Sequence, residues 1–221
     1  MAKNPPWREP RFGSIVEAAS SGQALTPLMQ GLRARTGGVT PQEQAAWINR
    51  LLRDGQYGFA YLAWVESLSP QQQQRIGNVY DGGFELLPSG AAFEWHLQDV
   101  AGAQVERAWV EGGSGAASLR IVFDERSREF SHVGQTLLLA PGRYRFSGRN
   151  RMMGIDEGAG LEWVLSCVES GKQIAQSPRL WGQHDWQMFA VEFEVPAQAC
   201  SGQRLVLRRP VVAVSRHCRY W

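Results

Sequence analysis

The sequence predicts an α+β protein in which a small helical hairpin unit precedes an antiparallel β-sandwich. Three observations predict this fold. The pattern is helical before residue 78, short runs of alternating apolar and polar residues follow it, and nine tryptophans supply aromatic side chains for a core. Helices and strands that are segregated along the chain are typical of α+β proteins. We therefore expect a helical region at 1–77 and a sandwich at 78–221.

Composition limits the classes of partner. A chain of 221 residues with 43% apolar content can bury a core. Its formal net charge is +2 and its basic residues form no run of five or more, so no nucleic-acid partner is expected. No stretch approaches the roughly 20 apolar residues that span a bilayer, and the first residues lack the apolar core of a signal peptide. We expect no membrane span, and either a cytoplasmic protein or a piece of a longer one.

The three cysteines are Cys167, Cys200 and Cys218. They are too few and too widely spaced for a disulfide scaffold or a paired metal motif. Cys167 lies in an expected strand and Cys200 directly after another, so a disulfide between them could join adjacent elements and leave Cys218 odd. Three reduced thiols, with at least one in the core, are the alternative, because free cysteine packs well as a small apolar side chain.

The first well-defined helix is predicted to begin after Thr40. Thr40 can cap the first turn, Pro41 suits the first helical position, and Glu43 stands three residues after the cap. The helix should run to about Asp54, and Gly55 should end it. Its apolar residues recur at helical spacing, so one stripe must be covered. These residues are Trp47, Ile48, Leu51 and Leu52.

The next segment, 57–68, is apolar nearly all round. A helix of this kind needs partners on more than one side. We expect it to form a hairpin with the preceding helix and to lean on the sandwich. Three further expectations complete this region: a short helix from Ser69-Pro70 through Arg75, one or two helices in 14–35 broken around 20–22 and 26–27, and an extended lead-in at 1–13.

Alternation with a period of two predicts the strands. In the clearest run, 187–196, four apolar residues fall on one face, two glutamates fall on the other, and a proline stops the strand. No helix-length apolar pattern interrupts the series, so a parallel sheet is not expected. The expected strands are 83–87, 92–98, 104–111, 117–124, 131–139, 142–151, 161–169, 173–180, 186–195, 203–209 and a last one at 211–217.

Several short segments follow one another in a particular order. They are Asn78 to Glu85, Phe93-Glu94-Trp95, Ala117 to Ile121, Val133-Gly134-Gln135, Pro141 to Phe146, and Trp186 leading to Phe193-Glu194-Val195-Pro196. This order resembles that of carbohydrate-binding-module-like jelly rolls with a galactose-binding-like fold, over roughly residues 78 to 210. The helical part resembles the last hairpins of tetratricopeptide-type bacterial proteins.

The resemblance implies a non-catalytic module that holds glycans on aromatic platforms, often with a structural calcium. Glu85 stands where such modules place an early calcium ligand, but the stretch 211–221 contains no acidic residue for the late one. We therefore expect no cofactor, with a structural calcium at Glu85 as the alternative. By analogy with the family, a longer exported protein would work at the cell envelope or in the periplasm.

Candidate sugar-binding residues come from the alternation. Ala108 and Val110 suit the core, which turns Arg107 and Trp109 outward. A sugar presents an apolar face to an indole, and its hydroxyls need fixed polar partners. Trp181 and Trp186 flank a loop at the sandwich rim, where Trp181 is a further candidate. Trp109 could instead pack under a loop or under the helical hairpin.

A row of arginines lies opposite Tyr144 and Phe146 in the expected strand. Guanidinium groups suit hydroxyl or carboxylate groups, so an acidic polysaccharide is a better ligand than a neutral one. The row could instead face Glu192 and Glu194 on a neighbouring strand. Trp95 and Trp163 share faces with leucines and phenylalanine, and we expect them in the core. The row consists of Arg143, Arg145, Arg149 and Arg151.

Catalysis is not predicted. Asp156 and Glu157 are sequence neighbours whose side chains diverge on an extended chain, and His184-Asp185 has no nucleophile in a recognisable motif beside it. The four histidines show no metal-ligand spacing. Two non-enzymatic hypotheses follow. The first is glycan binding on the sandwich, through Trp109, Trp181, Arg107, Arg149 and Arg151. The second is a structural or protein-interaction module that caps a helical repeat array and meets a protein partner through the helical region.

Overall fold

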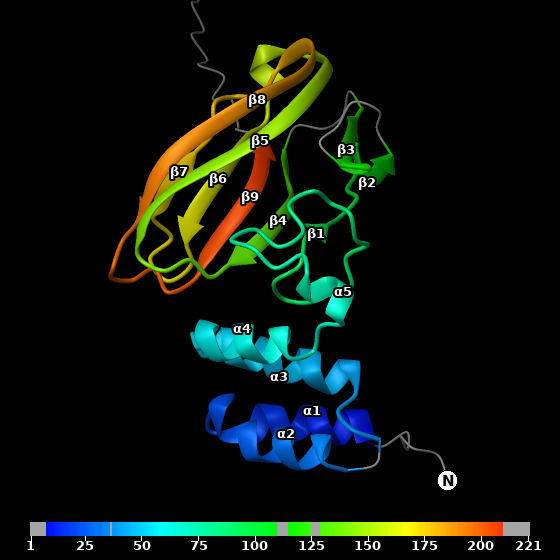
Figure 1. The fold of residues 1–221 in the computed structure, drawn as a ribbon, viewed down its shortest axis with the longest axis vertical. Helices are drawn as coiled ribbons and strands as arrows, with labels where there is room; N and C mark the ends of the chain where they lie inside the picture. The colour runs from blue at the N-terminus through cyan, green and yellow to red at the C-terminus, as the bar shows by residue number, and fades with distance from the viewer. Residues whose placement is uncertain (1–7, 36, 110–114, 125–128, 210–221) are drawn as a thin grey trace, which may run out of the picture.

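The computed structural model describes residues 8–35, 37–109, 115–124 and 129–209. Helices occupy the N-terminal part and antiparallel strands the rest, so the α+β prediction is correct. Figure 1 shows the helices stacked below the strands, with α3 and α4 nearer to the strands than α1 and α2. The expected last strand and Cys218 lie outside the described residues.

The helical unit contains five α-helices and one short 3-10 helix among the described residues. α1 packs on α3, and α3 packs on α4. The predicted hairpin is therefore present, and its second helix ends at Val65 rather than Leu68. The elements are α1 (Arg8–Ala18), η1 (Gln23–Leu25), α2 (Thr26–Arg33), α3 (Pro41–Arg53), α4 (Tyr57–Val65) and α5 (Pro70–Gln73).

The start of α3 forms as its sequence predicts. The Thr40 hydroxyl accepts a hydrogen bond from the Glu43 amide at 3.2 Å, and the Glu43 carboxylate accepts one from the Thr40 amide at 2.9 Å. Glu43 also pairs with Arg8, at 2.7 Å from Nε. Because Arg8 and the buried Phe12 and Val16 dock on the helical core, residues 8–13 are helical, and the expected extended lead-in is wrong there.

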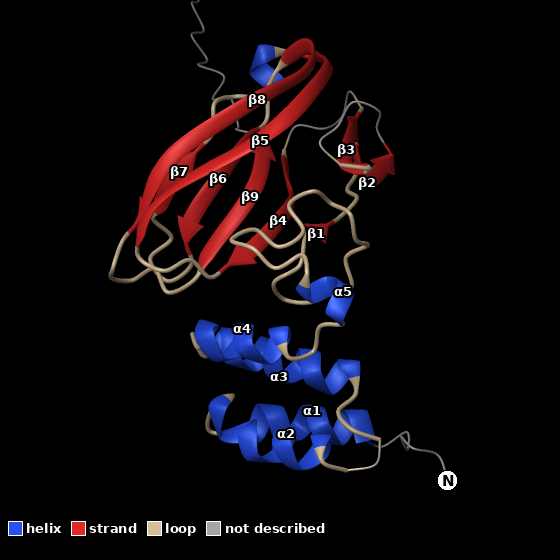
Figure 2. Ribbon diagram, viewed as in Figure 1, coloured by secondary structure: helices blue, strands red, loops and turns tan. Residues whose placement is uncertain are grey.

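The strands form three antiparallel sheets. A five-stranded sheet has the order β1-β4-β9-β6-β7, and β2–β3 and β5–β8 form two-stranded sheets. The long β5–β8 ribbon arches over β6 and β9 as the second layer of the sandwich, with β2–β3 beside it (Figure 2). The strands are β1 (His96–Leu97), β2 (Ala103–Trp109), β3 (Ala117–Phe123), β4 (Phe130–Leu137), β5 (Gly142–Ile155), β6 (Glu162–Cys167), β7 (Gln173–Gln176), β8 (Gly182–Val195) and β9 (Gln203–Arg209).

One expected strand is absent. Residues 83–87 belong instead to a turn segment that begins at Tyr80, and Asp81 and Phe84 in this segment have φ angles of 45° and 56°. The Asp81 carboxylate accepts hydrogen bonds from the amides of Glu85 and Leu86, at 3.1 and 2.8 Å. The carboxylate therefore supplies the hydrogen-bond acceptors that a neighbouring strand would otherwise provide. The expected strand 92–98 is also reduced, to His96–Leu97.

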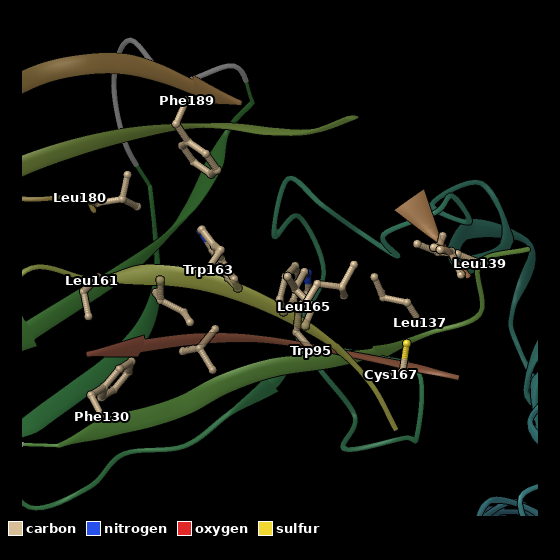
Figure 3. Close-up of a cluster of buried hydrophobic side chains, with 14 of the residues drawn as sticks. Trp95, Phe130, Leu137, Leu139, Leu161, Trp163, Leu165, Cys167, Leu180 and Phe189 are labelled. Atoms are coloured by element: carbon tan, nitrogen blue, oxygen red, sulfur yellow. The ribbon is translucent and has the colours of Figure 1, made fainter. Parts of the chain in front are cut away.

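Buried apolar residues form two clusters. The sandwich cluster lies between the two layers and includes Trp95 and Trp163, as predicted (Figure 3). The helical cluster centres on Trp64, which is 1% exposed. Two residues from beyond position 77, Tyr80 and Phe93, pack in the helical cluster, with ring centroids 4.9 and 5.4 Å from that of Trp64. The division at 77/78 stays a prediction.

Among the described residues, one contact ties the helical cluster to the sandwich and a second ties α4 to it. The fully buried Gln135 side chain of β4 accepts a hydrogen bond from the Tyr80 amide at 3.0 Å and donates one to the Tyr80 carbonyl at 2.9 Å. At the other contact, the backbone of Gly202 lies so close to Tyr57 that a Cβ at position 202 would come within 2.7 Å of the ring. The sandwich therefore holds residues of the helical unit through backbone as well as side-chain contacts.

A disulfide joins Cys167, at the end of β6, to Cys200, ahead of β9. Both residues are buried in the sandwich cluster. The sequence leaves open a disulfide or reduced thiols, and the structure contains the disulfide.

Candidate functional site

Trp109 is the last residue of β2 and is 73% exposed. Neither the helical hairpin nor a described loop buries it, so its expected outward orientation is correct. The guanidinium of Arg107 lies over the indole, with Cζ 5.2 Å from the ring centroid. Arg107 Nε donates to the Phe84 carbonyl at 2.7 Å, and Nη2 donates to the Glu85 carbonyl at 2.9 Å. The two carbonyl groups of the turn segment thus hold the Arg107 guanidinium in place, beside an exposed aromatic ring.

Glu85 supports this arrangement from the other side. Its Oε1 accepts hydrogen bonds from the amides of Ala116 and Ala117, at 3.0 and 3.5 Å, at the start of β3. No group of three or more histidine, cysteine or acidic side chains able to hold a metal occurs among the described residues. Calcium prefers six to eight oxygen ligands, and whether Glu85 helps to hold this ion stays a prediction.

The arginine row lies on the outward face of β5. Arg143 and Arg145 are the register partners of Glu194 and Glu192 on β8, which is the arrangement that the alternative interpretation of the row expects. Within the described residues neither arginine makes an ion pair with these glutamates at 4.0 Å or less. Exposed cross-strand ion pairs contribute little to stability even where they form.

The other half of the row has different neighbours. Arg149 is the register partner of Met188, and the Cζ atoms of Arg149 and Arg151 each lie 5.7 Å from the ring centroid of Trp186. Met188 is 73% exposed. Two guanidinium groups and an indole therefore form a cationic, aromatic surface on β5–β8.

Trp186 is a residue that the candidate set omits. The signal for it is present in the sequence, because even-numbered residues from 188 to 194 face outward along β8 and Trp186 continues that set. Trp181, which is in the set, lies just before β8 and is 46% exposed. The structure brings together Arg107 with Trp109, and Arg149 with Arg151. The two pairs stand on separate sheets.

His184 and Asp185 do not form a base with its orienting carboxylate. His184 Nδ1 lies 2.8 Å from the backbone carbonyl oxygen of Asp185, and Asp185 Oδ1 accepts the Trp186 amide at 2.8 Å. Both contacts are local, so this pair carries no arrangement for acid–base chemistry. Across the described ranges, no helix is long and apolar enough to cross a membrane.

Comparisons with known proteins find distant likenesses among solved structures. No protein family matches the chain, and no curated protein matches it. Three solved structures are similar to 61–62% of the chain. The arabinose-bound α-L-arabinofuranosidase MgGH51 is 18% identical with a TM-score of 0.41, and the enzymatically active domain of bacteriophage CBA120 tailspike protein 4 is 10% identical with a TM-score of 0.44. A CBM4 protein is 14% identical with a TM-score of 0.42.

The chain spans 23% of the arabinofuranosidase, 19% of the tailspike domain and 88% of the CBM4 protein. Because every TM-score lies below 0.5, function is inferred below from the side chains and not from these likenesses.

Proposed function

We propose that this protein is a non-catalytic module that binds a glycan on its sandwich, with Trp109 as the platform. The observation that supports this proposal is the high exposure of Trp109 next to a guanidinium that two carbonyl groups hold in place. An indole offers a flat apolar surface for the C–H face of a sugar, and a preorganised donor beside it binds hydroxyls at a low cost in entropy. Trp181 is a separate platform candidate.

The ligand that we propose is an acidic polysaccharide. Arg149 and Arg151 place two forked donors over Trp186, and guanidinium groups bind carboxylates in two-point geometry. A polymer chain can contact this surface and the Trp109 platform with different residues. Neutral oligosaccharides would use the platform alone.

An oligosaccharide array with uronate-containing and neutral members tests the ligand class. The Arg149→Gln/Arg151→Gln variant should lose roughly fivefold or more of the uronate signal and keep the neutral signal. The matched control is Arg143→Gln/Arg145→Gln. It removes two charges from the same face of β5 and keeps the two guanidinium groups beside Trp186. Equal losses in the two variants would mean that net charge alone attracts the ligand. No binding by the wild-type protein would contradict the proposed function.

A protein partner on the helical unit is the second candidate. Phe59 and Leu62 lie almost one turn apart on α4 and are 50% and 61% exposed. α1 and α3 begin 33 residues apart, and α2 and α4 begin 31 residues apart, close to the period of a tetratricopeptide-type array. In this alternative the sandwich caps such a helical repeat array in a bacterial protein. Phe59→Ser/Leu62→Ser should then weaken association with the partner and leave binding on the oligosaccharide array unchanged.

A further inference from the structure

A cavity of about 600 Å³ lies where the helical unit meets the loop ahead of β1. Its walls come from the end of α2, the loop 38–40, α3, the end of α4, one residue of α5 and the loop residues 89–94. This volume suits a small organic ligand. None of the residues of the two sandwich surfaces described above lines it, so it is a separate place in the molecule.

The charged side chains of the wall do not balance. They are Arg33, Glu66 and Glu94. Arg33 Nη1 pairs with Glu66 Oε2 at 2.5 Å, and its Nη2 donates to Gln44 Oε1 at 3.4 Å. Glu66 thus neutralises the charge of Arg33, and Glu94 leaves the wall with one excess negative charge.

Glu94 is only 5% exposed. Its Oε2 accepts the Ser89 amide at 2.6 Å, and within the described ranges no cation pairs with the carboxylate. A buried carboxylate without a cation is costly in free energy, which favours a positively charged partner. The nearby Tyr80 adds no charge, because burial, together with the Glu94 and Asp81 carboxylates, raises the pKa of this phenol to about 12 and keeps it neutral near pH 7.

The helix ends that line the cavity also favour a positively charged ligand. The last turn of α4 and the residues that follow it, through Leu68, line the cavity, and carbonyl groups at a helix C-terminus favour cations. The N-terminus of α3 also reaches the wall, where a helix would favour an anion. The Thr40 hydroxyl already caps that end, and Glu43 already supplies its negative charge.

We propose that this cavity binds a small organic cation that carries a primary ammonium group on an apolar stem. The ammonium pairs with Glu94, and the stem contacts the apolar part of the wall, which includes Ile48, Leu68 and Ala91. The proposal is independent of glycan binding on the sandwich.

The test uses n-hexylamine and 1-hexanol, which share an apolar stem and differ in the charged head. Titration of the full chain near pH 7, followed by NMR chemical shifts, should give n-hexylamine roughly tenfold tighter binding than 1-hexanol. Glu94→Gln keeps an oxygen that can accept the Ser89 amide and removes the charge, so it should weaken n-hexylamine roughly tenfold and leave 1-hexanol unchanged. Glu157→Gln, on an exposed residue far from the cavity wall, is the matched control and should change neither affinity.

A second variant tests the location without touching Glu94. Ala45 is an exposed residue of α3 that lines the cavity, so Ala45→Phe should fill part of it and weaken both compounds. Equal affinity for n-hexylamine and 1-hexanol in the wild-type protein would overturn the proposal, and so would unchanged n-hexylamine binding by Glu94→Gln. The failure of n-hexylamine to bind at millimolar concentration would overturn it as well.

Discussion

Removing the Cys167–Cys200 disulfide should lower the free energy of unfolding by about 3.7 kcal/mol, the value that a chain-entropy model gives for a closed loop of this length. The two cysteines are 33 residues apart in sequence, and the loop between them contains β7 and β8. Without the bond, the unfolded chain gains conformational freedom that the folded protein must then lose.

Urea unfolding of Cys167→Ala/Cys200→Ala, followed by tryptophan fluorescence, measures this effect. Adding dithiothreitol controls for lost packing, because the reductant should destabilise the wild-type protein and leave the double variant unchanged. A wild-type protein whose unfolding free energy is the same with and without reductant would show that the bond contributes nothing.

Gln135→Leu should cost about 2–6 kcal/mol of unfolding free energy. Leucine fills a similar space but cannot hydrogen-bond, so the amide and the carbonyl of Tyr80 lose their buried partner, at about 1–3 kcal/mol each. Since Tyr80 belongs to the helical cluster and Gln135 to β4, this variant should also weaken the junction between the two units.

Thr136→Val is the control for Gln135→Leu. It makes a polar-to-apolar change at the next residue of β4, which is partly exposed and not bonded to Tyr80. The change removes a long, exposed hydrogen bond that Thr136 Oγ1 accepts from Arg204 Nη1 at 3.4 Å. We expect this control to change the unfolding free energy by less than about 0.5 kcal/mol. Similar urea midpoints for the two variants would contradict the assigned role of Gln135.

Features set by local sequence were predictable. The capping residues of α3 act within one turn, and the outward arginines of β5 follow from a period of two. Trp95 and Trp163 were expected in the core because they share faces with apolar neighbours, and both are buried.

Features set by distant contacts were not predictable. The helical state of residues 8–13 depends on Arg8 pairing with Glu43, which lies 35 residues away. The turn at 83–87 has an apolar–polar pattern, but the Asp81 side chain binds its amides. Trp186 meets Arg149 and Arg151 because β5 and β8 pair in the register that sets Arg149 opposite Met188, and no single-strand pattern reveals that register.

The most direct test of glycan binding is the affinity of Trp109→Ala for the oligosaccharide that gives the strongest array signal. Because Trp109 is exposed, its removal should leave the fold intact and raise the dissociation constant roughly tenfold. Phe59→Ala removes an exposed aromatic ring from the helical unit and should bind as the wild type does. Equal dissociation constants for Trp109→Ala and the wild-type protein would contradict the account.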